Sequence, residues 1–156
     1  MKRLILEKLE KWKQSKRRKP LLLRGARQVG KTWVLKEFGN TFADGFVHID
    51  FDKQVEYRQF FEQTKDVKRI LDNLALATGK KITPKTLIIF DEIQACESAL
   101  NSLKYFYEDA PQYSVVGAGS LLGLKLASGF PVGKVEFLDM YPMTFTEFLL
   151  ANGDAN

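Results

Sequence analysis

Short apolar runs recur along this chain, and the longer segments between them repeat apolar residues every three or four positions. A short apolar run is typical of a strand, and a repeat of three or four is typical of a helix that buries one face. The predicted strands are 21–23, 46–52, 86–90, 113–116 and 135–138. The predicted helices are 2–17, 33–38, 55–78 in two pieces, 97–109 and 144–150.

The order of these elements predicts the fold class. Strands and helices alternate, which favours an α/β fold with a mostly parallel sheet and helices on both faces. The run 87–90 supports a parallel sheet, because four consecutive apolar residues need cover on both faces of a strand. Ligands of such sheets bind beyond the carboxyl ends of the strands. In the segment 55–78 we expect the buried side to consist of Val67, Ile70, Leu71, Leu74 and Leu76.

Length and composition describe one globular domain. The chain has 156 residues, enough for a core, and its 45% of apolar residues argues against disorder. Cys96 is the single cysteine, so an internal disulfide is excluded and we expect the reducing cytoplasm as its location. We interpret Cys96 as a small buried hydrophobe, and one Cys with one His excludes a Cys/His zinc cluster. No apolar run approaches the length of a membrane span, so we expect no membrane partner.

The net charge of +5 is concentrated at the N-terminus. Residues 1–20 hold nine Lys and Arg side chains against two Glu, a balance of +7, so the other residues sum to −2. The apolar stripe of the first helix is Ile5, Leu9 and Trp12, and the lysines lie off it. Two interpretations remain open: the helix packs on the domain with a solvated basic face, or it contacts DNA, another nucleic acid or an acidic partner.

The candidate binding motif is the glycine loop after the first predicted strand, Gly25-Ala26-Arg27-Gln28-Val29-Gly30-Lys31-Thr32. Its spacing, G-x-x-x-x-G-K-T, and its place before a helix that starts near Trp33 match a phosphate-binding loop. Glycines let backbone N–H groups point at a polyphosphate, and the helix start adds its own free N–H groups. Lys31 supplies a charge for the outer phosphates, and the Thr32 hydroxyl is a ligand for Mg²⁺. We therefore expect residues 25–33 to bind a nucleotide.

Two acidic residues, Asp91 and Glu92, follow the third predicted strand at the ligand edge of the sheet. Asp91 is suited to hold Mg²⁺ together with Thr32. Glu92 is suited to act as the general base that orients and deprotonates a water in line with the γ-phosphate. Ser120 follows the fourth predicted strand, and it either senses the γ-phosphate or positions the attacking water, or else caps the next helix.

The second predicted strand carries three polar residues whose roles differ. We interpret His48, the single histidine, as a sheet side chain rather than a catalytic group. Asp50 and Asp52 lie at or past the carboxyl end of this strand, where an α/β sheet binds its ligands. They are open to two interpretations, as part of that ligand edge or as turn residues.

Three segments together resemble the prokaryotic AAA+-like P-loop ATPases. They are the loop 25–32, Asp91-Glu92-Ile93-Gln94, and Tyr141-Pro142-Met143-Thr144-Phe145-Thr146-Glu147-Phe148-Leu149. The resemblance extends from the helix that contains Trp12 to Leu150. It implies an AAA-like P-loop NTPase fold, a three-layer sandwich whose five-stranded sheet has the strand before Ser120 between those before Lys31 and Asp91. It also implies ATP with Mg²⁺ as the bound cofactors.

The chain departs from that family in two places. Members carry a small hydroxyl residue one or two positions before the Gly-Ser pair, where this chain has Gly117 and Ala118. Members also continue into a helical lid and a C-terminal domain of unknown function, whereas this chain ends where those parts begin. We therefore expect a basic N-terminal helix and linker at 1–20 and an AAA-like core at 21–156, with lid and C-terminal domain absent. Arg27 and Lys134 are the nearest basic candidates for an arginine finger.

Two functions from different classes remain open. The first is an ATPase that hydrolyses ATP to ADP and phosphate with Mg²⁺, using Glu92 as the base and Lys31 on the phosphates. The second is a nucleotide-dependent switch without turnover, which controls a contact with DNA, with a protein partner or with a second copy of itself. A GTPase is disfavoured because the sequence has no Asn-Lys-x-Asp guanine motif.

Overall fold

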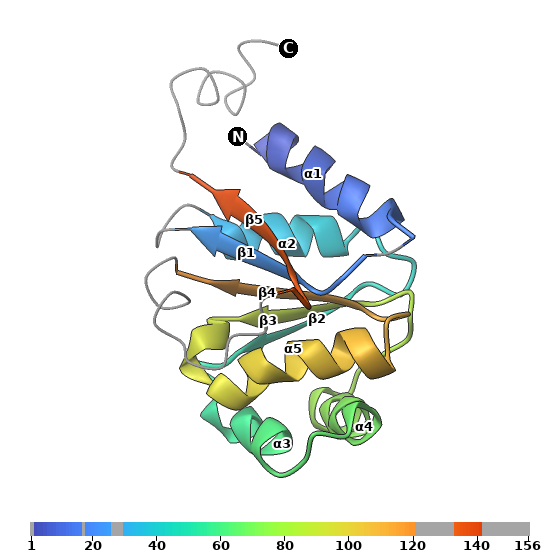
Figure 1. Cartoon of the computed structure of the whole chain (residues 1–156), viewed down its shortest axis with the longest axis vertical. Helices are drawn as coiled ribbons and strands as arrows, with labels where there is room; N and C mark the ends of the chain where they lie inside the picture. Colours follow the sequence, from blue (N-terminus) through green and yellow to red (C-terminus); the bar gives the residue numbers. More distant parts are fainter. Residues whose placement is uncertain (1, 17, 26–29, 121–132, 142–156) are drawn as a thin grey trace.

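A computed structural model of the chain contains one five-stranded sheet with helices on both faces (Figure 1). It describes residues 2–16, 18–25, 30–120 and 133–141. The neighbouring strands pair in parallel, and β4 lies between β1 and β3, as the resemblance implied. The α/β fold class with a parallel five-stranded sheet is therefore confirmed. The strands are β1 Leu21–Gly25, β2 Phe46–Asp50, β3 Leu87–Asp91, β4 Ser114–Gly119 and β5 Glu136–Met140, in the order β2-β3-β4-β1-β5.

Helices form a layer on each face of the sheet. In Figure 1, α1 lies above the sheet, α2 is drawn behind β1 and β5, and α3, α4 and α5 lie below the sheet. Residues of α1 and α2 share one core, and residues of α3, α4 and α5 share the other. The predicted helix at 144–150 lies outside the described residues. The helices are α1 Lys2–Gln14, α2 Lys31–Gly39, α3 Gln59–Glu62, α4 Val67–Thr78 and α5 Glu97–Asp109, with short 3-10 segments η1 Val55–Arg58 and η2 Ile93–Ala95.

The central strands send alternate side chains into the two helical layers. Leu22 and Phe90 lie in the core between the sheet and α3, α4 and α5. Leu21 and Ile89, their sequence neighbours, lie in the core between the sheet and α1 and α2. All four side chains are almost completely buried. Cover on both faces explains why these strands are continuous apolar runs in the sequence.

One predicted core position in α4 is wrong. Leu76 is 83% exposed, whereas Val67, Ile70, Leu71 and Leu74 are buried. The buried residues repeat at intervals of three and four and share one face of the helix. Leu76 lies two positions after Leu74, which is about 200° around the helix axis, so its side chain points into solvent.

α1 packs against α2 and closes one face of the domain. Ile5, Leu9 and Trp12 are buried. The ring of Trp12 lies 6.3 Å, centroid to centroid, from that of Phe38 in α2. The indole Nε1–H of Trp12 donates to the carbonyl oxygen of Lys19 at 2.7 Å, which anchors the segment that leads into β1. This helix therefore packs on the domain, as the first interpretation expected; the packing of its apolar stripe does not decide what its basic face contacts.

Two further expectations concern burial and membranes. Cys96 is buried, and burial raises the pKa of its thiol, as expected for a cysteine that packs as a small hydrophobe. Among the helices that the structure describes, none has the length and apolar character needed to cross a bilayer.

Candidate functional site

The carboxyl ends of the parallel strands bring several candidate residues to one edge of the sheet. Gly25 ends β1, Asp91 ends β3, and Ser120 follows β4, which lies between those two strands. Because the strands run in the same direction, their carboxyl ends meet at the left of Figure 1, beside the start of α2. This is the edge at which open α/β sheets bind ligands.

Gly30, in the glycine loop between β1 and α2, is the N-cap residue of α2. Gly30 has φ 87° and ψ 24°, a left-handed conformation that glycine adopts without strain. Its carbonyl oxygen accepts the first helical hydrogen bond, from the N–H of Val34 at 3.0 Å. Lys31 is buried, and its Nζ donates to the carbonyl oxygen of Gly25 at 2.8 Å, so the lysine joins the two ends of the loop. The four loop residues Ala26, Arg27, Gln28 and Val29 lie outside the described residues, and their backbone cradle stays a prediction.

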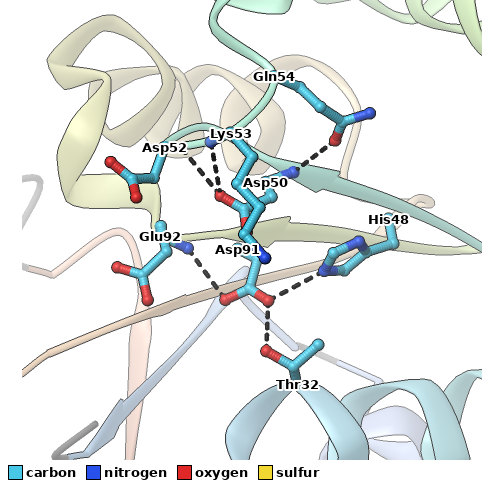
Figure 2. Close-up of polar contacts among 8 residues, drawn as sticks. All are labelled: Thr32, His48, Asp50, Asp52, Lys53, Gln54, Asp91 and Glu92. Atoms are coloured by element: carbon cyan, nitrogen blue, oxygen red, sulfur yellow. Dashed lines mark hydrogen bonds and ion pairs between the residues drawn. The ribbon is translucent and has the colours of Figure 1, made fainter.

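Asp91 is the centre of the polar contacts at this edge (Figure 2). Its side chain is almost fully buried, and its Oδ2 accepts hydrogen bonds from Thr32 Oγ1 at 2.5 Å and from His48 Nε2 at 2.9 Å. Its Oδ1 accepts the backbone N–H of Glu92 at 3.0 Å. Burial by itself raises the pKa of Asp91, but the hydrogen bonds from His48 and Thr32 outweigh it and hold the pKa below its usual value. Asp91 is therefore a carboxylate at neutral pH.

The side chains of Thr32 and Asp91 fit Mg²⁺. Mg²⁺ prefers hard oxygen ligands, and proteins hold it by one or two carboxylates while waters and substrate phosphates complete its octahedron. A hydroxyl and a buried carboxylate face each other here at hydrogen-bonding distance. They come from the start of α2 and the end of β3, 59 positions apart in the sequence.

Glu92 has a backbone conformation that residues other than glycine rarely adopt. Its φ of 50° and ψ of 46° are left-handed, and in the described part of the chain no other non-glycine residue has a positive φ. Such strain costs about 1–3 kcal/mol and persists where the surroundings hold it in place. The Glu92 N–H is bonded to Asp91, and its Oε2 accepts a hydrogen bond from Gln94 Nε2 at 2.7 Å. A strained residue at a ligand edge is a candidate for function.

These groups line an open cleft of about 490 Å³. Another cleft, of about 540 Å³, lies between α3 and α5. The candidate functional site is therefore identified by the chemistry of the residues that line it and not by its size. Only the first cleft lies beside the glycine loop, and Trp33, which is 45% exposed, lines it as well. Its lining residues are Gly30, Lys31, Thr32, Trp33, Asp50, Asp52, Lys53, Asp91 and Glu92.

The two aspartates after β2 line the cleft, and one of them is also a turn residue. Asp50 Oδ1 accepts the N–H groups of Asp52 at 2.9 Å and of Lys53 at 3.1 Å, which turns the chain at the end of β2 (Figure 2). This turn explains why β2 ends two residues earlier than predicted. Ser120 is half-buried at the end of β4, and its proposed sensor role stays a prediction.

Sequence reasoning missed two neighbours of the acidic pair, His48 and Gln94. His48 lies in β2, and the register pairs β2 with β3 so that Asp50 is opposite Asp91 and His48 two positions earlier. Alternation along β2 places His48 on the same face as Asp50, but only the pairing of the strands brings it to Asp91. For Gln94, the sequence offers only its position two residues after Glu92 as an indication of the contact. The left-handed turn at Glu92, which brings the two side chains together, cannot be recognised in the sequence.

The sequence matches a family model described as an AAA domain over residues 17–149. No curated protein matches this sequence. Similar solved structures include the Walker-type ATPase of Pyrococcus abyssi, with a TM-score of 0.57 and 20% identity over 95% of this chain and 56% of that one. The ORC1 protein of Aeropyrum pernix in complex with DNA has a TM-score of 0.60 and 15% identity over 99% and 48% of the two chains.

DnaA of Aquifex aeolicus, solved with AMPPCP bound, is a third similar structure. Its TM-score is 0.56 and its identity 13%, over 96% of this chain and 48% of that one. At such low identities these likenesses show the fold alone. This chain spans about half the length of the three solved proteins.

Proposed function

The chain belongs to the AAA domain family, and from that premise we propose that it binds ATP with Mg²⁺ and hydrolyses it to ADP and phosphate. Nucleotide binding and ATPase activity are the function of this family. The observation that carries the proposal is the hydrogen bond between Thr32 and Asp91, because it joins the glycine loop to the acidic pair in one cleft.

The proposed reaction assigns a separate task to each side chain. Lys31 places its ammonium group on the outer phosphates of ATP, in exchange for its present bond to the Gly25 carbonyl. Thr32 and Asp91 would hold Mg²⁺, which when bound neutralises part of the charge on the phosphates. Burial of Asp91 restricts its motion and fixes the direction of its ligand oxygen.

Glu92 acts as the general base. A water oxygen attacks the γ-phosphorus, its proton passes to the Glu92 carboxylate, and the bond between the γ-phosphorus and the bridging oxygen of ADP breaks. Gln94 holds one carboxylate oxygen of Glu92 and leaves the other to take the proton. A glutamine at position 92 would preserve the shape of the side chain but accept no proton.

The test compares the wild-type protein with Glu92→Gln and Lys31→Ala. In Glu92→Gln we expect ATP affinity to persist and turnover to fall by roughly 10²–10⁴-fold, the usual share of a general base. In Lys31→Ala we expect weaker ATP binding, because a charged phosphate contact is lost. Equilibrium binding of a fluorescent ATP analogue and release of radiolabelled phosphate measure the two quantities. Hydrolysis at the wild-type rate in Glu92→Gln would contradict the assignment.

A nucleotide-dependent switch without turnover is the second candidate. It is supported by the exposed basic side chains of α1 and by the similarity of the fold to an ORC1 protein solved in complex with DNA. Tight ATP binding with no phosphate release at any protein concentration supports the switch over the ATPase. A protein partner or self-association, a cytoplasmic location and the boundary between segment 1–20 and the core remain proposals from the sequence.

A further inference from the structure

A group of basic side chains gathers at the amino edge of the sheet, opposite the candidate nucleotide site. We call Lys13, Lys16, Arg18, Lys19 and Lys134 the amino-edge cluster. They come from the end of α1, the segment that leads into β1 and the segment that leads into β5. The ends of α1 and α5 lie at the right of Figure 1, whereas α2 starts at the left. Lys134, named above as a candidate for an arginine finger, precedes β5 and therefore lies at the opposite edge of the sheet from Lys31, which starts α2.

Contacts across these segments hold the cluster together. Lys19 Nζ donates to the carbonyl oxygen of Gly133 at 2.9 Å, next to Lys134. The ammonium groups of Lys19 and Lys134 lie 5.8 Å and 5.6 Å from the ring centroid of Tyr107 at the end of α5. These contacts join a segment near the N-terminus to one more than 110 positions later in the sequence.

Arg18 connects this pair of lysines to α1. Its guanidinium donates to the carbonyl oxygens of Lys13 at 3.2 Å and of Gln112 at 3.0 Å, and lies over the ring of Trp12. Lys13 Nζ in turn donates to the carbonyl oxygen of Thr41 at 3.4 Å. The positive charges are thus held by backbone carbonyls and aromatic rings.

In the described part of the chain, no member of the amino-edge cluster forms an ion pair with a carboxylate. The ion pairs there join Arg24 to Asp139, His48 to Asp91 and Lys68 to Asp72, and none includes a member of the cluster. Like charges held close together repel one another and create a positive potential over the surface. A polyanion that binds there relieves the repulsion and releases its own counterions.

We propose that the amino-edge cluster binds the phosphate backbone of a nucleic acid. Four of its five members are lysines, flexible point charges that suit a row of phosphates. The large apolar side chains exposed on the described surface are Leu4, Trp33, Val55, Leu76, Phe137 and Tyr141, and none belongs to the cluster. An acidic protein partner would need apolar or aromatic anchors for affinity, whereas binding to a phosphate backbone needs charge alone.

This surface is separate from the candidate nucleotide site. The binding of nucleic acid proposed for it goes beyond the proposed ATPase function. β1 joins the two, with Lys19 just before its first residue and Gly25 at its end. Five residues of strand span about 16 Å, so a change at the cluster leaves the residues of the cleft in place. ATP binding can therefore serve as an independent control.

The test uses the whole chain and two double variants of equal charge. Lys16→Glu with Lys134→Glu changes two exposed members of the cluster. Lys65→Glu with Arg69→Glu is the matched control, because both side chains are exposed, just before α4 and within it, in the helical layer across the sheet from α1, and no ion pair of the described residues includes either. Fluorescence anisotropy measures binding to labelled duplex DNA and duplex RNA of about 20 base pairs, at about 50 and 200 mM salt.

We expect the wild-type protein and the control variant to bind with similar affinity and to weaken as salt rises. The cluster variant should bind on the order of 10- to 100-fold more weakly at the lower salt and lose about 2 from the slope of log K against log salt, the share of two phosphate contacts. Its ATP affinity and melting temperature should equal those of the control variant. The DNA and RNA arms show which nucleic acid is preferred.

Two results would overturn the proposal. One is equal nucleic-acid binding by the cluster variant and the control variant, which would place the contact elsewhere. The other is binding of labelled poly-glutamate, but of neither duplex, in a manner that depends on Lys16 and Lys134; the partner would then be an acidic protein. Neither result bears on ATP hydrolysis, which Glu92→Gln tests on its own.

Discussion

Asp91 is the residue at which three segments of the chain meet. Thr32 from α2 and His48 from β2 donate to the same carboxylate oxygen, and the backbone of Glu92 donates to the other. Its residue type and its place after an apolar strand predicted a role at the ligand edge. Its partner His48 was not predicted, because a contact between neighbouring strands depends on their order and register.

At this scale Glu92 offers a test that separates its backbone from its side chain. Glu92→Gly should raise the free energy of unfolding, because glycine adopts φ 50° without the strain that a side chain causes. The larger conformational entropy of glycine in the unfolded state offsets part of this gain, so the net increase should be up to about 1 kcal/mol. Glu92→Gln keeps the strain and should leave stability unchanged. Urea denaturation of both variants checks this, and a glycine variant less stable than the glutamine variant would contradict it.

α2 begins with Lys31 and Thr32, the proposed contacts of the phosphates and of Mg²⁺, and its far end is fixed by a close approach to β2. A Cβ added at Gly39 would lie 2.6 Å from the Cβ of Phe46, closer than packed atoms tolerate. Gly39 is the last residue of α2, and its lack of a side chain leaves room for Phe46. β2, which carries His48 and Asp50, is held against the end of α2 by the same contact.

Gly39→Ala tests this approach. Overpacking should destabilise the protein by about 1–3 kcal/mol, despite the higher helix propensity of alanine. Glu37→Ala, an exposed position on the same helix, is the control and should lie within about 0.5 kcal/mol of the wild-type protein. Thermal denaturation measures both. A stabilised Gly39→Ala variant would show that helix propensity dominates and that α2 and β2 are not in close contact.

At the scale of the whole molecule, α1 is part of the folded domain and not an appendage to it. Its apolar stripe covers α2, and the segment after it carries the amino-edge cluster. The candidate nucleotide cleft and the amino-edge cluster therefore lie at opposite edges of one sheet.

Removal of the Trp12 side chain tests the packing of α1. Trp12→Ala should lower the free energy of unfolding by about 3–5 kcal/mol, because a buried aromatic side chain and its hydrogen bond to Lys19 are lost. Leu4→Ala, at a position on the same helix that is 50% exposed, should change stability by less than about 0.5 kcal/mol. Equal stabilities of the two variants in chemical denaturation would show that α1 does not dock on the domain.

Local patterns in the sequence determined the fold class, most of the helices and strands and the residues of the glycine loop and acidic pair. These features depend on the spacing of neighbouring residues: four consecutive apolar residues before Asp91 require a covered strand, and Gly30-Lys31-Thr32 requires a helix start. Leu76 shows the limit of such patterns. An apolar residue in an amphipathic segment is buried only if it lies on the face that meets the core.

The tertiary structure alone decided which distant residues meet. The pairing of β2 with β3 brought His48 to Asp91, the left-handed turn at Glu92 brought Gln94 to its carboxylate, and the sheet placed Lys134 beside Lys19 at the amino edge. Each contact joins side chains whose separation is set by strand order, register or a single backbone angle. These quantities result from packing of the whole chain, and no local pattern of residues specifies them.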